Sequence, residues 1–147
     1  MKVLWYRYEM LLMALIDKVK KHDFDQIVCI GRGGFLVGDA LSRALDIPLA
    51  VIMAQSYFKL EKQVLKFSRI ASLLPLEGDI LLVDDLVDTG DTLFEIKKSL
   101  YEYDEIKIVQ TGVIWKKKDS KFIPDYYVED IDSNEWIDQP FEIFNKA

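Results

Sequence analysis

The sequence predicts an α/β fold, with a mainly parallel twisted sheet flanked by helices. Short, continuously apolar runs alternate along the chain with longer segments in which apolar residues recur at helical spacing. Continuous apolar runs are typical of strands that are covered on both faces, as in a parallel sheet. The runs at 26–30 and 79–85 end in turns rich in glycine and in aspartate. Such turns at the carboxyl ends of parallel strands are expected to face one crevice.

The individual elements follow from periodicity. Apolar residues at intervals of three and four predict helices at 8–21, 36–45 and 92–103. Apolar runs bounded by turn residues predict strands at 26–30, 49–54, 79–85, 106–115 and 126–131. The charged stretch 57–75 alternates only weakly and is expected to form a hairpin or a mobile hood.

Length and composition restrict the class of protein. A chain of 147 residues is expected to form one domain, 1–147, with a proper core. The net charge of −6 argues against a general nucleic-acid binder. No apolar run approaches the roughly 20 residues that cross a bilayer, so no integral membrane association is expected. The single Cys29 lies in an apolar run, which excludes a disulfide framework and fits a buried thiol in a cytoplasmic protein. His22 is expected to lie exposed at a helix end.

Three carboxylates stand at the end of the apolar run 79–85. Asp84 and Asp85 are adjacent, and Asp88 follows after one short step. Strand alternation predicts that Asp84 and Asp85 point to opposite sides, where they could accept hydrogen bonds from ribose hydroxyls or hold Mg²⁺. Helix capping would explain one of the three acids but not all of them.

The segment that follows has the composition of a phosphate cradle. Gly90 allows a positive φ and close backbone approach, and the hydroxyls of Thr89 and Thr92 can donate to phosphate oxygens. The carboxylate of Asp91 is expected to point outward, away from an anion. A simple turn with a threonine N-cap is the structural alternative.

Two further groups are weaker signals. The loop 31–34 surrounds Arg32 with three glycines and would suit an anion, but it lacks the lysine of a Walker A loop and is explained equally well as a turn. Residues 115–118 end a strand with three lysines, and Trp136 follows at a distance. Taken from the residues alone, these favour a solvated basic turn and a core tryptophan over a pocket for a planar heterocycle.

Residues 82–92 resemble the phosphoribosyl pyrophosphate (PRPP) signature of type I phosphoribosyltransferases: a hydrophobic run, two acids, two further residues, then Asp-Thr-Gly. The similarity extends over most of the chain. It includes the glycine loop 31–34 and the segment 136–140 (Trp-Ile-Asp-Gln-Pro). These matches resemble most the small bacterial xanthine-guanine phosphoribosyltransferases, which act on 6-oxopurines.

The resemblance implies roles for the donor side of the site. Asp84 and Asp85 match the acids that hold the ribose hydroxyls and organise Mg²⁺. Asp88 matches the acid beside the purine N7, a candidate general base, and residues 88–92 match the 5′-phosphate loop. Arg32 and Gly33 match a pyrophosphate loop that often contains a non-proline cis peptide.

The resemblance also implies which residues bind the purine base. Lys117 matches the lysine that contacts the 6-oxo group, although the register within 116–118 is open by one residue. Trp136 matches the aromatic residue that stacks on the base, and the backbone near Ile137 would read the substituent at position 2. Members of this family carry an arginine in a mobile loop, which corresponds here to part of the stretch 57–75. Lys59 or Lys62 could take the place of that arginine.

The resemblance therefore implies a purine-salvage enzyme that joins PRPP to guanine, xanthine or hypoxanthine, with Mg²⁺, as a homodimer or homotetramer with a small hood formed by the chain ends. The sequence does not rank the three bases. Two alternatives stay open: a regulatory protein that senses PRPP or a nucleotide on the same fold, and a phosphoribosyltransferase for another base.

Overall fold

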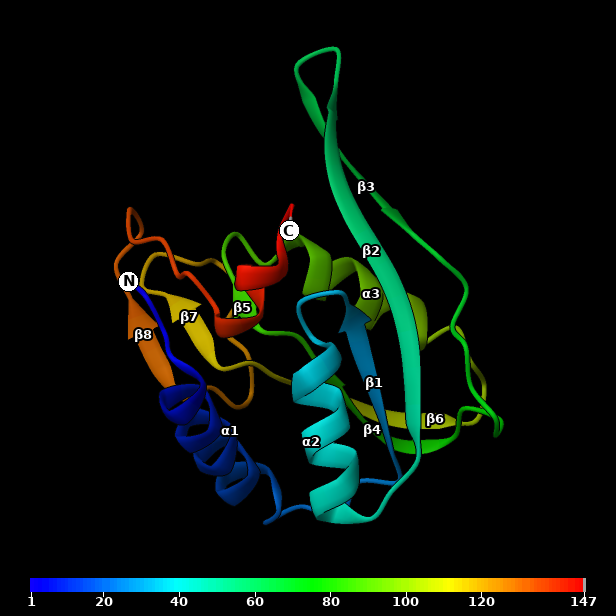
Figure 1. The fold of residues 1–147 in the computed structure, drawn as a ribbon. Helices are drawn as coiled ribbons and strands as arrows, with labels where there is room; N and C mark the ends of the chain where they lie inside the picture. The colour runs from blue at the N-terminus through cyan, green and yellow to red at the C-terminus, as the bar shows by residue number, and fades with distance from the viewer. Residues whose placement is uncertain (147) are drawn as a thin grey trace.

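The computed structural model describes residues 1–146 and confirms the α/β fold (Figure 1). Its main sheet has five strands in the order β3-β2-β1-β4-β6, all parallel except for the antiparallel pair β2 and β3. These strands are β1 (Gln26–Gly31), β2 (Leu49–Lys59), β3 (Lys62–Phe67), β4 (Gly78–Val83) and β6 (Ile106–Gly112). The helices are α1 (Trp5–Val19), α2 (Phe35–Leu45) and α3 (Asp91–Leu100), close to the predicted positions.

Both faces of the main sheet are buried, which explains the continuous apolar runs. Along β1, Ile27 and Cys29 pack into a cluster with α1 and α2, whereas Val28 and Ile30 pack into a second cluster with α3. Strand β4 divides its side chains between the same two clusters. Successive side chains of β1 and β4 therefore alternate between two apolar clusters. Because neither face of these strands is polar, the sequence shows a continuous apolar run there and no apolar–polar alternation.

The stretch 57–75 contains the expected hairpin. Strands β2 and β3 pair from Ala54 with Phe67 out to Lys59 with Lys62. The turn between them uses Leu60 and Glu61, both at positive φ (51° and 61°), as a two-residue hairpin turn requires. The hairpin projects well beyond the sheet (Figure 1).

A second, smaller sheet forms part of the hood. Its strands run in the order β5-β7-β8, with all pairs parallel: β5 (Leu86–Val87), β7 (Trp115–Lys117) and β8 (Glu129–Ile131). The prediction of a single strand at 106–115 is therefore wrong. The chain leaves the main sheet after Gly112 and enters the second sheet at Trp115. The backbone carbonyl of Asp85 accepts hydrogen bonds from the N–H groups of Ile114 (3.0 Å) and Trp115 (3.1 Å). This contact is tertiary, so the apolar pattern carries no sign of the break.

The chain ends complete the hood. The backbone N–H of Val3 donates to the carbonyl of Asp138 (2.9 Å), and the N–H of Asp138 donates to the carbonyl of Met1 (2.8 Å). A 3-10 helix, η1 (Pro140–Phe144), follows, and Phe141 packs edge-on against the ring of Tyr8 in α1. The first and last segments therefore support one another beside the second sheet (Figure 1).

One expectation at the far end of the sheet is wrong. His22 was expected to lie exposed, but its Nε2 lies 2.9 Å from Oδ2 of Asp79, and its ring packs on Phe24 with 31% of the side chain exposed. The partner Asp79 is 57 residues away in the sequence, so helix-end periodicity could not identify it.

Candidate active site

The carboxyl ends of β1 and β4 bring the glycine loop and the acid pair together. Arg32, Gly33, Asp84 and Asp85 line one hollow of about 240 Å³, together with Thr92 at the start of α3. An adjoining hollow of about 190 Å³ contains residues 86–93. The expected crevice at the strand ends is present, and both predicted loops open onto it.

The two adjacent acids do not follow strand alternation. Strand β4 ends at Val83, and both Asp84 and Asp85 line the same hollow. The backbone N–H of Asp85 donates to Oδ1 of Asp84 (2.8 Å). Burial, and then the neighbouring Asp85 charge, raise the pKa of Asp84 well above its usual range. A cation at this position would relieve both effects.

The segment after the acids has the geometry expected of an anion loop. Gly90 adopts φ 92°, and α3 begins at the next residue, so the first-turn N–H groups of α3 have no helical partners. The N–H of Asp91 donates to Oγ1 of Thr89 (3.3 Å), and Asp91 is exposed at the rim of the hollow. Phe122 packs so closely on Gly90 that a Cβ would overlap its side chain. Sequence reasoning missed this support, since Phe122 lies in an irregular loop.

The glycine loop has a cis peptide bond between Gly31 and Arg32. Its turn is closed by hydrogen bonds from Gly34 N–H to the carbonyl of Ile30 (2.8 Å) and from Phe35 N–H to the carbonyl of Arg32 (3.0 Å). The Arg32 side chain is exposed and lines the hollow with the acids. This loop therefore presents a cation beside the acid pair, and its glycines let the backbone pack closely against neighbouring groups.

Among the described ion pairs, only one of the three consecutive lysines at 116–118 contacts an acid of the loop at 88–92. Nζ of Lys117 lies 3.3 Å from Oδ2 of Asp88, whereas Lys116 pairs with Asp130 (3.1 Å) and Lys118 with Asp132 (2.9 Å). The Lys117 side chain is 15% exposed and that of Asp88 is 65% exposed. Of the three lysines, Lys117 is therefore the one that contacts Asp88 in the loop of residues 88–92.

The hood segment after β8 carries the remaining predicted residues. Trp136 is largely exposed (75%), so a core role is excluded, while Ile137 is buried in the core cluster that includes α1. Gln139, two residues further on, donates from Nε2 to Oδ2 of Asp85 (2.5 Å). Sequence reasoning gave Gln139 no role, because its partner lies 54 residues away.

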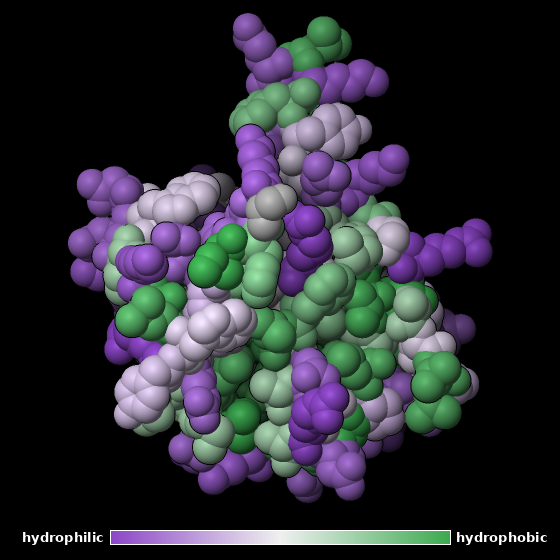
Figure 2. All heavy atoms as spheres, viewed as in Figure 1, coloured by the Kyte–Doolittle hydropathy of each residue, from purple (hydrophilic) through white to green (hydrophobic). Residues whose placement is uncertain are grey.

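The two hairpin lysines named from the sequence lie elsewhere. Lys59 and Lys62 face each other at the hairpin turn and are exposed, and neither lines the two hollows. Lys66, lower on β3, instead lines a hollow of about 690 Å³ that also contains Arg32. Figure 2 shows the hairpin as a narrow projection standing clear of the body.

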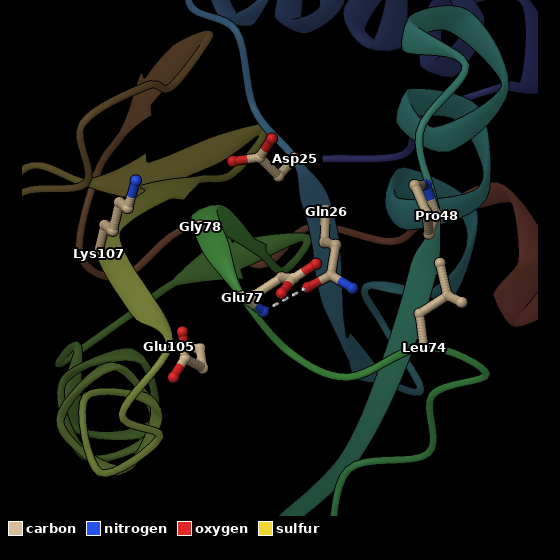
Figure 3. A pocket seen from close by; sticks show the side chains of 8 residues that line it. All are labelled: Asp25, Gln26, Pro48, Leu74, Glu77, Gly78, Glu105 and Lys107. Atoms are coloured by element: carbon tan, nitrogen blue, oxygen red, sulfur yellow. Dashed lines mark hydrogen bonds between the residues drawn. The ribbon is translucent and has the colours of Figure 1, made fainter.

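The surface has a further hollow far from the acid pair. A hollow of about 440 Å³ lies at the amino ends of the strands, where Gln26 accepts from the N–H of Glu77 (3.1 Å) and donates to the carbonyl of Pro75 (2.9 Å) (Figure 3). Its other polar lining groups are mostly carboxylates. Within residues 1–146, no three acidic, histidine or cysteine side chains are grouped to hold a metal by themselves. No helix in that range has the length and apolar character to cross a membrane.

A mainly parallel sheet with paired acids and a glycine turn at its carboxyl edge defines the class of open α/β proteins whose ligands bind at the strand ends. Residues 7–144 match the phosphoribosyl transferase domain model. The chain therefore belongs to the phosphoribosyltransferase family, and its fold is that of the type I members.

Solved structures support the same assignment. A purine phosphoribosyltransferase from Pyrococcus horikoshii Ot3 superposes with a TM-score of 0.80 at 27% identity, covering 96% of this chain and 93% of that one. A xanthine-guanine-hypoxanthine phosphoribosyltransferase from Helicobacter pylori gives 0.85 at 26% identity, covering 99% and 95%. A protein from Neisseria gonorrhoeae, solved with bound ppGpp, shares the fold (0.80, 22% identity, 98% and 90% coverage).

Proposed function

We propose that this protein is a purine-salvage phosphoribosyltransferase. It transfers the phosphoribosyl group of PRPP to a 6-oxopurine and yields the nucleoside 5′-monophosphate and pyrophosphate, with residues 1–147 acting as one catalytic domain. The observation that carries the proposal is the Lys117–Asp88 pair at 3.3 Å. Lys117 is a hydrogen-bond donor and Asp88 is a candidate base, and they come from two different segments of the chain. They meet at the edge of the loop proposed to bind the 5′-phosphate, where a purine would lie next to the sugar.

On the donor side, we assign the 5′-phosphate to the loop formed by residues 88–92. Asp84 and Asp85 accept hydrogen bonds from the ribose hydroxyls, and their charge favours the oxocarbenium-like transition state. Arg32 and Gly33 bind the pyrophosphate, whose negative charge grows as its bond to the anomeric carbon breaks. Relatives with 26% and 27% identity that bear purine phosphoribosyltransferase names support an activity of this class.

On the base side, Lys117 donates to the 6-oxo group, Trp136 stacks on the ring, and the backbone near Ile137 contacts the substituent at position 2. The purine N9 forms the new bond to the anomeric carbon while the bond to pyrophosphate breaks. Asp88 takes the N7 proton or holds the productive tautomer. The exposed ring of Trp136 supports a stacking role, since an aromatic face is available to a ligand.

The acid pair fits Mg²⁺. This ion is commonly held by only one or two carboxylates together with substrate phosphates, so a third protein ligand is not needed. The raised pKa of Asp84, caused by burial and the Asp85 charge, indicates that a cation would be favourable there. Asp84 and Asp85 would hold the ion, which when bound neutralises charge on the leaving pyrophosphate.

A panel of bases tests the proposal. Purified protein is mixed with PRPP and Mg²⁺, and the ultraviolet absorbance is followed with guanine, xanthine, hypoxanthine, adenine or orotate. Turnover confined to 6-oxopurines supports the proposal, whereas turnover with adenine or orotate alone identifies another base. No turnover with any base, combined with thermal stabilisation by PRPP or a nucleotide, would identify a sensor on this fold instead.

A further inference from the structure

The backbone of Asp85 is fixed on both sides by hydrogen bonds. Its N–H donates to Oδ1 of Asp84 (2.8 Å). Its carbonyl accepts from the N–H groups of Ile114 (3.0 Å) and Trp115 (3.1 Å), where the chain passes from the main sheet to the second one. The position of the Asp85 backbone is therefore set jointly by the two sheets.

The carboxylate of Asp85 is fixed as well. It lies against Gly33, so closely that a Cβ there would overlap the carboxylate oxygens. Nε2 of Gln139 also donates to Oδ2, at 2.5 Å. A carboxylate held between backbone and a donor has little freedom to rotate, so its orientation is determined before any ligand arrives.

Gln139 is suited to this contact. It is 8% exposed, and its N–H donates to Oε2 of Glu142 (2.5 Å), which anchors the residue at the start of η1. The orientation of its amide is set by chemistry, since only the NH₂ group can donate to a carboxylate.

Gln139 also belongs to the segment proposed to hold the base. It lies three residues after Trp136 and two after Ile137. One side-chain hydrogen bond therefore joins the base segment to an acid on the donor side.

We propose that Gln139 is a positioning residue that orients the Asp85 carboxylate for the donor and its metal ion, and that ties this acid to the base segment. This inference rests on the proposed function, because it assigns Asp85 to donor binding. Partners of metal-binding carboxylates typically contribute about 10- to 100-fold to metal affinity or activity.

Two variants separate positioning from space filling. Gln139→Met keeps the length of the side chain but removes the donor, and Gln139→Glu keeps the shape but sets a second carboxylate against Asp85. If Gln139 positions Asp85, the dissociation constant for PRPP with Mg²⁺ rises about 10- to 100-fold in Gln139→Met. It rises further in Gln139→Glu. If Gln139 only fills space, the isosteric glutamate is the better tolerated of the two.

Gln26→Met is the matched control. Gln26 is also a buried glutamine (4% exposed) with side-chain hydrogen bonds, but it lies at the opposite end of the sheet (Figure 3). We expect it to lower the unfolding temperature while leaving the dissociation constant for PRPP unchanged. If Gln26→Met does not fold, Gln110→Met replaces it, since the side chain of that glutamine accepts from the hydroxyl of Tyr126 (3.0 Å), away from the acid pair.

The experiment measures PRPP binding with Mg²⁺ by calorimetry and by the rise in unfolding temperature, and kcat and KM for PRPP and guanine alongside. In an Asp85→Ala background, Gln139→Met should change the dissociation constant by less than about twofold, because the carboxylate that accepts from Gln139 is gone. A wild-type protein that neither binds PRPP nor turns over would overturn the proposed function. A wild-type protein that does both, with Gln139→Met equal to Gln26→Met, would overturn the positioning role alone.

Discussion

At the scale of single residues, the Lys117–Asp88 pair has a direct consequence for substrate binding. The two side chains lie 3.3 Å apart, so the groups proposed to contact a purine are in contact with each other in its absence. A base entering the site would exchange this ion pair for its own hydrogen bonds. The two residues should therefore differ in which kinetic constant they control.

Removing the Asp88 carboxylate should affect the chemical step. We expect Asp88→Asn to lower kcat by about 10²- to 10⁴-fold, the range typical of a general base, and to leave the fold intact because the side chain is 65% exposed. Steady-state kinetics with the best base of the panel measures this. Near-wild-type turnover would remove the general-base assignment.

Removing the Lys117 ammonium should affect base binding. We expect Lys117→Ala to raise KM for the purine about tenfold or more, and KM for PRPP much less, because a hydrogen bond to a charged donor is worth about 1.5–3 kcal/mol. Lys118→Ala is the control, since Lys118 pairs with Asp132 outside the loop. If the control shows the larger effect, the lysine register is shifted by one.

We expect the Asp84 carboxylate to lower the free energy of unfolding when no ligand is bound. Its pKa is raised in the folded state by burial and by Asp85, so protonation favours folding, and this stabilisation is lost as the pH rises through the folded-state pKa. We expect Asp84→Asn to raise the free energy of unfolding at pH 7 by on the order of 1 kcal/mol, with a smaller gain near pH 4. Urea denaturation at both pH values measures this, and a loss of stability at both would contradict the assigned cause.

The acids at 84, 85 and 88 and the phosphate loop could be predicted from the sequence because they form one local signature. The Gln139–Asp85 contact could not, because two segments 54 residues apart meet only in the folded chain. The same reason explains why Lys66 rather than Lys59 shares a hollow with Arg32: hairpin register is not visible in weak alternation. Local signatures identify chemistry, whereas long-range contacts decide which neighbours support it.

At the scale of elements, periodicity located the helices and central strands but missed the break after Gly112. Strand β6 ends there, and β7 begins at Trp115 in another sheet. Residues 113 and 114 are fully buried, and both are β-branched apolar residues that are typical of a strand. The break depends on hydrogen bonds to Asp85 and Tyr126, which no local pattern encodes.

The turn into α3 offers a test at this scale. We expect Gly90→Ala to lower stability by about 1–3 kcal/mol and to raise KM for PRPP at least tenfold, because φ is 92° and the new Cβ would overlap Phe122. Gly112→Ala is the matched control, since a Cβ there meets only ordinary contacts at 3.7 Å or more. Thermal unfolding and donor kinetics measure both effects, and equal tolerance of the two variants would contradict the role of the turn.

At the scale of the whole molecule, the hood links the two ends of the chain. The N–H of Val3 donates to Asp138, in the segment that follows Trp136. We expect Val3→Pro, which removes this donor, to raise KM for the purine roughly fivefold, the equivalent of about 1 kcal/mol for one hydrogen bond. Val3→Ala keeps the N–H and should lower the unfolding temperature without this change in KM. A larger effect of Val3→Ala on KM would show that packing, not the backbone bond, holds the segment.

The change of sheet after Gly112 also divides the chain in an evolutionary sense. The residues proposed to hold the sugar donor lie between 31 and 92, and those proposed to hold the base lie between 115 and 137. Only Asp88, as the proposed base, serves both groups of residues. A lineage could therefore acquire a different nucleobase preference through substitutions in the later part of the chain and inherit the earlier part unaltered. The hydrogen bond between Asp85 and Gln139 crosses that boundary, so exchanging the later part between relatives should succeed only where this contact is kept.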